Sequence, residues 1–147
     1  MTTRRRAREI VLQVLFEEDL HPMRDEQIAM DFLFKRLSYN DSLIDFAKEL
    51  LVGVRSHRAE IDKLLSKYSA NWSIKRMATS DRNVMRIAAY EMLYGETPGR
   101  VAINEAIDIA KRYGSLNSGA FVNGILDRMF KDHKAADAQA DGSSAQA

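Results

Sequence analysis

Four arginines stand within five positions near the start of the chain, at Arg4, Arg5, Arg6 and Arg8. Guanidinium groups bind phosphate through several N–H donors, so such a run could hold the backbone of a nucleic acid. The first turn of a helix carries the positive end of the helix dipole, and each cation placed there costs about 0.3–1 kcal/mol. An anionic partner explains this unfavourable placement. On these residues alone, a solubilising terminus is an equal alternative.

A second candidate for phosphate binding lies near the other end of the chain. Small residues at 115–119 precede an apolar helical pattern, and the free N–H groups at the start of such a helix can hold a phosphate. Phe121, one turn further on, could stack on an unpaired base. Its spacing from Ile125 favours a core position instead.

The sequence offers little for catalysis or metal binding. His21, His57 and His133 lie in three separate segments, which favours a surface position over metal ligation for each. Residues 114–119 match only the first half of a phosphate-binding loop, because Ala and Phe follow where Lys and Ser or Thr are required. The absence of cysteine excludes a disulfide, a thiol nucleophile and a zinc–thiolate site. We expect no enzyme activity, no cofactor and no metal.

The composition is typical of a soluble globular protein, with 46% hydrophobic and 29% charged residues. A formal net charge of +1 excludes a strongly basic protein that coats nucleic acid, so any binding must come from local patches. Lys75, Arg76, Arg82 and Arg86, opposed only by Asp81, form one such group. No segment reaches the roughly 18 apolar residues of a membrane span. We expect a cytoplasmic protein.

The elements that must position these residues are helices, because the hydrophobic pattern has a helical period almost throughout. We predict an all-α fold of about seven helices, with an N-terminal sub-bundle at about 4–70 and a C-terminal sub-bundle at about 71–130, joined near residues 71–73. Residues 81–94 are apolar around most of their circumference, which is typical of a central helix. Residues 131–147 have no large apolar side chain, so we expect a disordered tail.

Some boundaries and contacts are also predicted. Asp25 can cap the second helix and Asp41 or Ser42 the third. The third helical stretch is expected to break near residues 56–57. Gly53 is expected to allow two helices to approach closely, as is Gly124 near the C-terminus.

Four sequence blocks together resemble the NusB family of transcription antitermination factors. They are RRRARE (4–9) with LQVLF (12–16), WSIKRM (72–77) with DRNVMRIAAYE (81–91), VAINEA (101–106) with AK (110–111), and FVNGILD (121–127). The blocks follow the family's order over roughly residues 4–130. The resemblance implies an all-helical fold of two small bundles and a protein that is not an enzyme.

The resemblance also implies partners. Members of the family bind the boxA element of nascent RNA together with NusE, which is also a protein of the small ribosomal subunit. The complex joins other Nus factors on RNA polymerase and suppresses termination, notably in ribosomal RNA operons. A homodimer that shields the arginines of the free protein is a further hypothesis.

Two sets of residues follow from the resemblance by position. The RNA-binding set, with the arginine run completed by its first member, is Arg4, Arg5, Arg6, Arg8, Asn117, Ser118 and Phe121. The partner-binding set is Phe16 and Asp81, of which Phe16 replaces a tyrosine common in the family and so lacks a hydroxyl. Asn104, Glu105 and Asn123 belong to the blocks as well, but we expect them to be hydrogen-bonded braces between helices.

Two other functions stay open at this stage. The RNA-binding domain of ribosomal RNA cytosine methyltransferases shares this helical module, but that family continues into a cofactor-binding α/β domain with catalytic cysteines. This chain has a polar tail and no cysteine. The other alternative is a scaffolding protein that uses apolar grooves, with the arginines incidental.

Overall fold

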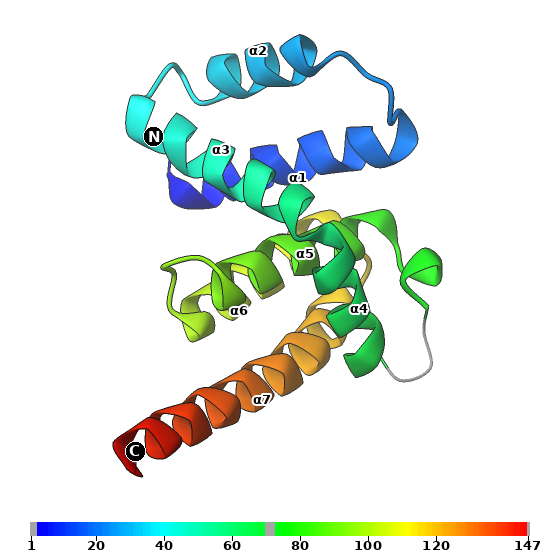
Figure 1. Cartoon of the computed structure of the whole chain (residues 1–147). Coiled ribbons are helices and arrows are strands. Elements are labelled where there is room, and N and C mark those ends of the chain that lie inside the picture. The colour runs from blue at the N-terminus through cyan, green and yellow to red at the C-terminus, as the bar shows by residue number, and fades with distance from the viewer. Residues whose placement is uncertain (1–2, 70–72, 147) are drawn as a thin grey trace.

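Seven α-helices and one 3-10 helix make up the computed structural model, which describes residues 3–69 and 73–146 (Figure 1). They are α1 (Arg4–Leu20), α2 (Glu26–Arg36), α3 (Asp41–Ser56), α4 (Arg58–Tyr68), η1 (Ile74–Arg76), α5 (Thr79–Leu93), α6 (Gly99–Tyr113) and α7 (Ser118–Gln146). No strand occurs in the described ranges. The predicted all-α fold of about seven helices is confirmed.

Local sequence sets the first helix boundaries. Side-chain oxygens of Thr3, Asp25 and Asn40 accept hydrogen bonds from first-turn N–H groups and so cap α1, α2 and α3. The cap at Asp25 confirms the prediction, whereas the third cap lies one residue before Asp41. The predicted break is also confirmed, because only His57 separates α3 from α4.

The helix α5 lies at the centre of the molecule, as predicted. It contacts α1, α3, α4, α6 and α7, and side chains all around it are buried. In Figure 1, α1, α2 and α3 lie on one side of α5, with α6 and α7 on the other. The buried apolar residues of both sides form one continuous core.

The division into two bundles differs from the prediction in the place of α4. This helix packs on α5 and α7 as well as on α3, with Ile61 and Leu65 fully buried. It therefore belongs with α5–α7, and the two groups meet at His57 rather than near residues 71–73. Residues 71 and 72 of the predicted joint lie outside the described part of the chain.

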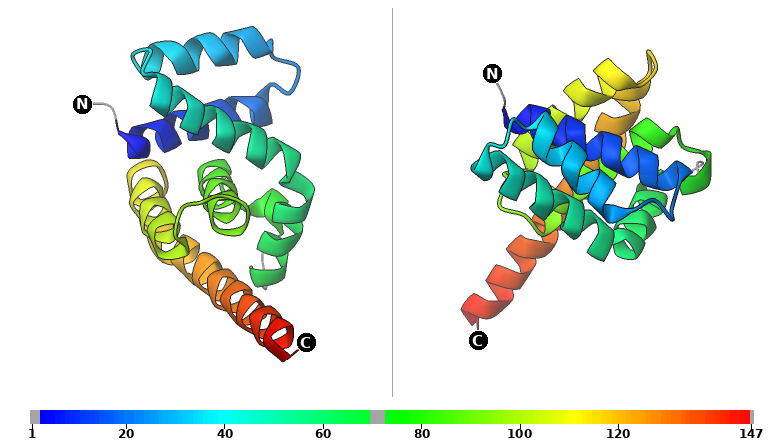
Figure 2. Two further views of the ribbon diagram at one scale, coloured as in Figure 1. Left: turned by 60° about the vertical axis from the view of Figure 1, so that its left-hand side comes forward. Right: turned by 90° about the horizontal axis from the view of Figure 1, so that it is seen from above.

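The helix α7 continues to Gln146, where the sequence predicted a disordered tail from residue 131. Tyr68 donates a hydrogen bond of 2.7 Å to Asp132, which ties this part of α7 to α4. The alanines at 135, 136 and 138 are exposed, and alanine has the highest helix propensity, so the helix extends without burying them. Figure 2 shows this end of α7 projecting beyond the other helices.

Candidate RNA-binding and partner-binding surfaces

The arginine run at the start of α1 is met by carboxylates of the same molecule. Arg5 donates from Nε and Nη2 to the two carboxylate oxygens of Glu105, at 2.7 and 3.2 Å. Its Nη2 also donates to Asp108 at 2.9 Å. The hydrogen bond from Arg5 lowers the pKa of Glu105, and this effect outweighs the opposing effect of burial. Arg5 is thus a half-exposed cation held by two carboxylates of α6.

Arg4 and Arg6 are held more loosely. Arg4 is exposed, and its guanidinium carbon lies 4.6 Å from the centroid of the Phe46 ring, a contact that leaves its N–H groups open to solvent. Arg6 is partly exposed and lies 3.6 Å from Glu9. These two arginines keep donors that a phosphate could reach.

Arg8 does not fit the predicted RNA-binding set. It is only 5% exposed, and its Nε and Nη2 donate to the two carboxylate oxygens of Glu91 at 2.7 and 2.8 Å. Glu91 is itself buried in α5. A phosphate would have to displace a bidentate, desolvated partner, so we correct the prediction and assign Arg8 to the core between α1 and α5.

The loop between α6 and α7 places the other predicted RNA-binding residues unequally. Asn117 is exposed, as an RNA contact requires. Ser118 is 1% exposed, and its Oγ accepts a hydrogen bond of 2.8 Å from the N–H of Ser115, so its side chain holds the loop and does not face solvent. Phe121 is partly buried against the core, in agreement with the alternative that its spacing favoured. Of these three residues, only Asn117 is fully available.

Lys111 is a cation near this loop that the sequence did not single out as a site residue. A Cβ built on Gly119 would lie 3.0 Å from Cγ and Cε of Lys111, so the lysine stem crosses the start of α7 where no side chain stands in its way. Lys111 is exposed. Lys111 belongs to the third sequence block that resembles the NusB family, and this position could have indicated it as a site residue.

Glu9 joins the start of α1 to the end of α6. Its buried carboxylate accepts a hydrogen bond from Arg112 at 3.3 Å and a short one from the hydroxyl of Tyr113. Burial and this bond to Glu9 raise the pKa of Tyr113. Because the α6–α7 loop begins directly after Tyr113, the structure places that loop beside α1. Residues about a hundred positions apart thus lie on one side of the molecule.

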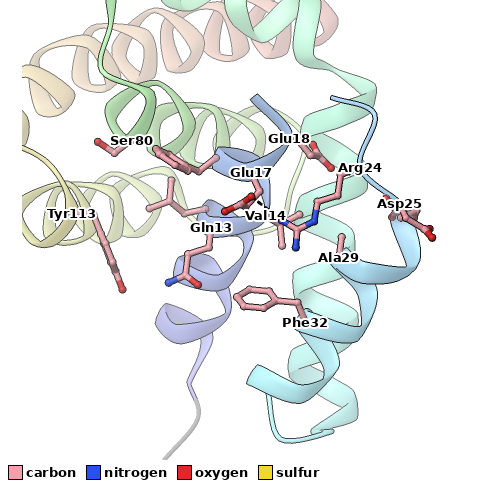
Figure 3. A pocket seen from close by; sticks show the side chains of 13 residues that line it. Gln13, Val14, Glu17, Glu18, Arg24, Asp25, Ala29, Phe32, Ser80 and Tyr113 are labelled. Carbon is pink, nitrogen blue, oxygen red and sulfur yellow. Dashed lines mark hydrogen bonds and ion pairs between the residues drawn. The ribbon is translucent and has the colours of Figure 1, made fainter. Parts of the chain in front are cut away.

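A hollow of about 420 Å³ opens between α1 and α2 on the same side (Figure 3). Phe16 lines it and is 39% exposed, which agrees with a role in partner binding. Its lining residues are Leu12, Gln13, Val14, Phe16, Glu17, Glu18, Arg24, Asp25, Glu26, Ala29, Phe32, Ser80 and Tyr113. Four carboxylates and one arginine stand beside the apolar side chains, and three of these carboxylates, Glu17, Glu18 and Glu26, are paired with Arg24 or Arg55 of the same molecule. The hollow therefore offers its apolar lining to a group of a partner. Figure 3 shows Arg24 paired with Glu17, at 2.8 Å.

Asp81, which was predicted to bind the partner, is not among the residues that line this hollow. It is 7% exposed and lies in the first turn of α5, where the helix dipole stabilises a carboxylate. Its Oδ1 has no hydrogen-bond partner among the described residues. Its neighbour Ser80 lines the hollow instead. We therefore correct the partner-binding set: the start of α5 reaches the hollow through Ser80.

The basic group at residues 75–86 is not one patch. Arg86 is buried and donates to both carboxylate oxygens of Asp62, at 2.7 and 2.8 Å. Arg82 donates to Asp19 at 2.9 Å. These ion pairs hold α5 against α1 and α4, and only Lys75 and Arg76 remain exposed, on η1.

The predicted polar braces also divide. Glu105 is a brace, because it accepts two hydrogen bonds from Arg5. Asn104 and Asn123 are exposed on α6 and α7, so the prediction was wrong for both. Helical spacing could have placed Asn104 on the outer face, since Ile103 and Ala106 define the inner one.

These features describe a protein built to bind other molecules. An all-helical scaffold presents arginines, a polar loop and an open apolar hollow along one side of α1. In the described part of the chain, no group of three or more His, Cys, Asp or Glu side chains could hold a metal ion. None of the helices traced there is long and apolar enough to cross a membrane. The fold and surfaces define a small all-helical protein whose accessible cations and open hollow suit an anionic ligand and a protein partner.

Comparison with known proteins names the family. The model of the NusB family matches residues 5–131. The transcription antitermination protein NusB of Bdellovibrio bacteriovorus is 44% identical over 135 residues, covering 90% of this chain and 98% of that protein. NusB of Desulfitobacterium hafniense is 47% identical over 129 residues, covering 86% and 87%. The chain therefore belongs to the NusB family, and as a member it is a transcription antitermination factor and not an enzyme.

Solved structures agree with this assignment. NusB of T. maritima is similar with a TM-score of 0.79 and 41% identity, covering 89% of this chain and 93% of that one. A chain from the crystal structure of the antitermination factors NusB and NusE in complex with dsRNA is similar with a TM-score of 0.79 and 25% identity, covering 88% and 96%.

Proposed function

We propose that this protein binds the boxA element of nascent RNA together with NusE and suppresses transcription termination, chiefly in ribosomal RNA operons. The observation that carries the proposal is family membership over residues 5–131 combined with the two surfaces that adjoin along α1. The solved relative in complex with NusE and RNA supports both partners. Assembly with other Nus factors on RNA polymerase in the cytoplasm belongs to the same proposal, as does a homodimer of the free protein.

The proposed RNA surface consists of the accessible groups at the start of α1 and around the α6–α7 loop. Arg4 and Arg6 supply donors for phosphate, Lys111 adds a further cation, and Asn117 offers an amide to a base or sugar. Phe121 can present only the edge that the core leaves open. So few phosphate contacts give modest, salt-sensitive binding, and a partner that completes the site raises it.

The proposed NusE surface is the hollow beside Phe16. Its apolar lining offers burial to an apolar side chain of the partner. Tyr113 lines this hollow and also bonds to Glu9 beside Arg6, so the partner surface adjoins the RNA surface.

The RNA assignment is tested with Arg4→Ala/Arg6→Ala, leaving the buried Arg8 intact. Fluorescence anisotropy measures binding of labelled single-stranded boxA RNA and a scrambled RNA, with and without NusE, at several salt concentrations. We expect weak binding alone, stronger binding with NusE, and a loss in the variant with the salt slope reduced by about 0.7 for each phosphate contact removed. The control Arg100→Ala/Arg128→Ala removes two exposed arginines elsewhere. Unchanged affinity in Arg4→Ala/Arg6→Ala would refute the arginine assignment, and equal affinity for scrambled RNA would refute boxA specificity.

The NusE assignment is tested with Phe16→Ala. We expect weaker NusE association in calorimetry, because the variant loses the exposed ring that lines the hollow, while RNA binding without NusE stays as in the wild type. The control Ile28→Ala removes a similarly exposed apolar side chain of α2 outside the hollow. Equal NusE affinity for both variants would place the partner surface elsewhere.

A further inference from the structure

Arg5 differs from the other arginines at the start of α1 because it is exposed to solvent and also hydrogen-bonded to two carboxylates. Its side chain is 47% exposed, yet its guanidinium bonds to Glu105 and to Asp108. Asp108 is 49% exposed, so this part of the cluster faces solvent. Arg8 is bonded to the buried Glu91 and its Nη1 lies 3.9 Å from Glu105, whereas the guanidinium of Arg5 donates to Glu105 and Asp108 at the edge of the RNA surface.

The two carboxylates occupy the donors that a phosphate would use. A guanidinium recognises phosphate with paired, coplanar N–H groups, the same groups that bind a carboxylate. In Arg5, Nε and Nη2 form this pair, and both are already bonded. An RNA phosphate must therefore displace a carboxylate, or accept a hydrogen bond from Nη1 alone beside two negative charges.

We infer that Glu105 and Asp108 compete with RNA for Arg5 and so set how tightly the protein holds RNA of any sequence. This inference rests on the proposed RNA-binding function and assigns these two carboxylates a role in it. Phosphate contacts carry no sequence information, so the competition lowers binding to boxA and to other RNA by the same factor. The protein then binds only weakly to RNA that makes no base contacts and has no adjoining partner protein.

Asp108→Asn tests the inference, because it removes one competing charge while Glu105 continues to hold Arg5. An exposed ion pair is weak, so we expect RNA to bind about two- to fivefold more tightly, with the same factor for boxA and scrambled RNA. Asp127→Asn is the matched control. It changes the net charge equally and removes the partner of another exposed arginine, Arg100, which lies at the opposite end of α6.

Arg5→Ala completes the test in a double-mutant cycle. In that background, Asp108→Asn is expected to change RNA affinity no more than Asp127→Asn does, because the group it competes for is gone. A gain that persists without Arg5 would overturn the inference in favour of general charge repulsion. No gain in Asp108→Asn, while the wild type binds RNA and Arg5→Ala binds it less well, would overturn the inference and leave the proposed function standing. A wild type that binds no RNA even with NusE would overturn both.

Discussion

Replacing Arg8 should destabilise the protein, although this residue belongs to a run of arginines that looks like a nucleic-acid contact. Its bidentate pair with Glu91 is buried at both ends, with 5% and 2% of the two residues exposed. Arg8→Met keeps most of the side-chain volume but leaves the carboxylate of Glu91 without its partner. Removing one member of a buried pair lowers the free energy of unfolding by about 3–5 kcal/mol. For a chain of this length, that corresponds to a melting temperature about 10–16 °C lower.

Urea and thermal unfolding followed by circular dichroism measure this change. The control Arg4→Met removes an exposed arginine about one turn earlier in the same helix and should cost less than about 1 kcal/mol. The double variant Arg8→Met/Glu91→Leu should regain most of the lost stability, because replacing both members of a buried pair with apolar groups is often neutral. If Arg8→Met and Arg4→Met destabilise equally, the pair does not hold α1 to α5 and the assignment fails.

The same double variant separates folding from binding. If Arg8 makes no RNA contact, Arg8→Met/Glu91→Leu should bind boxA RNA with wild-type affinity in the anisotropy assay. A large loss of affinity in a variant that remains folded would return Arg8 to the RNA-binding set. Any substitution of the whole arginine run would confuse these two effects.

Two further predictions concern stability. Gly53→Ala should lower the free energy of unfolding by about 1–3 kcal/mol, because the new Cβ would lie 2.1 Å from Cε2 of Tyr90. Gly124→Ala should raise it by about 0.5–1 kcal/mol, because the nearest atom is 3.9 Å away and alanine favours a helix. Equal effects of the two substitutions in urea unfolding would contradict this packing. Burial raises the pKa of Asp19, but hydrogen bonds from Asn83 and Arg82 and the charges of Arg86 and Arg82 outweigh it and lower the pKa overall. A lowered folded-state pKa means that this carboxylate stabilises the fold above about pH 3.9 and loses that contribution as the pH falls further. Between pH 6 and pH 2.5, the free energy of unfolding should therefore fall less steeply for Asp19→Asn than for the wild type. Identical slopes would contradict the assignment.

The charge polarity of α1 shows what sequence reasoning reached and where it stopped. Cations in the first turn and carboxylates in the last are unfavourable for an isolated helix, and the sequence suggested an external anion as the reason. In the structure, Arg8 meets a carboxylate 83 positions away and Arg5 meets one 100 positions away. At the other end of α1, Asp19 meets Arg82, 63 positions away. Tertiary ion pairs explain much of the polarity, and spacing within α1 cannot reveal them.

Some corrections could have been made from spacing alone. Arg8 lies four and seven positions before the buried Leu12 and Leu15, on the inner stripe of the helix, so its burial was readable from the sequence. The positions of Asp81 and Ser118 were not readable. Whether a polar residue in a first turn faces inward depends on the neighbouring helix or loop that covers it, and local sequence does not specify that cover. The hollow beside Phe16 likewise exists only because α2 packs beside α1.

The arrangement along α1 also gives a physical reason for a two-component site. Of the four arginines, one is buried, one is held by competing carboxylates, and only Arg4 and Arg6 are loosely held. Contacts of that number hold single-stranded RNA weakly and lose affinity as salt rises. The hollow beside Phe16 adjoins the same surface through Tyr113, so a protein bound there would lie next to the RNA and could contact it. Linkage then requires that RNA strengthen partner binding by the same factor as the partner strengthens RNA binding. On the proposed function, a sparse cationic surface therefore makes RNA binding dependent on the partner.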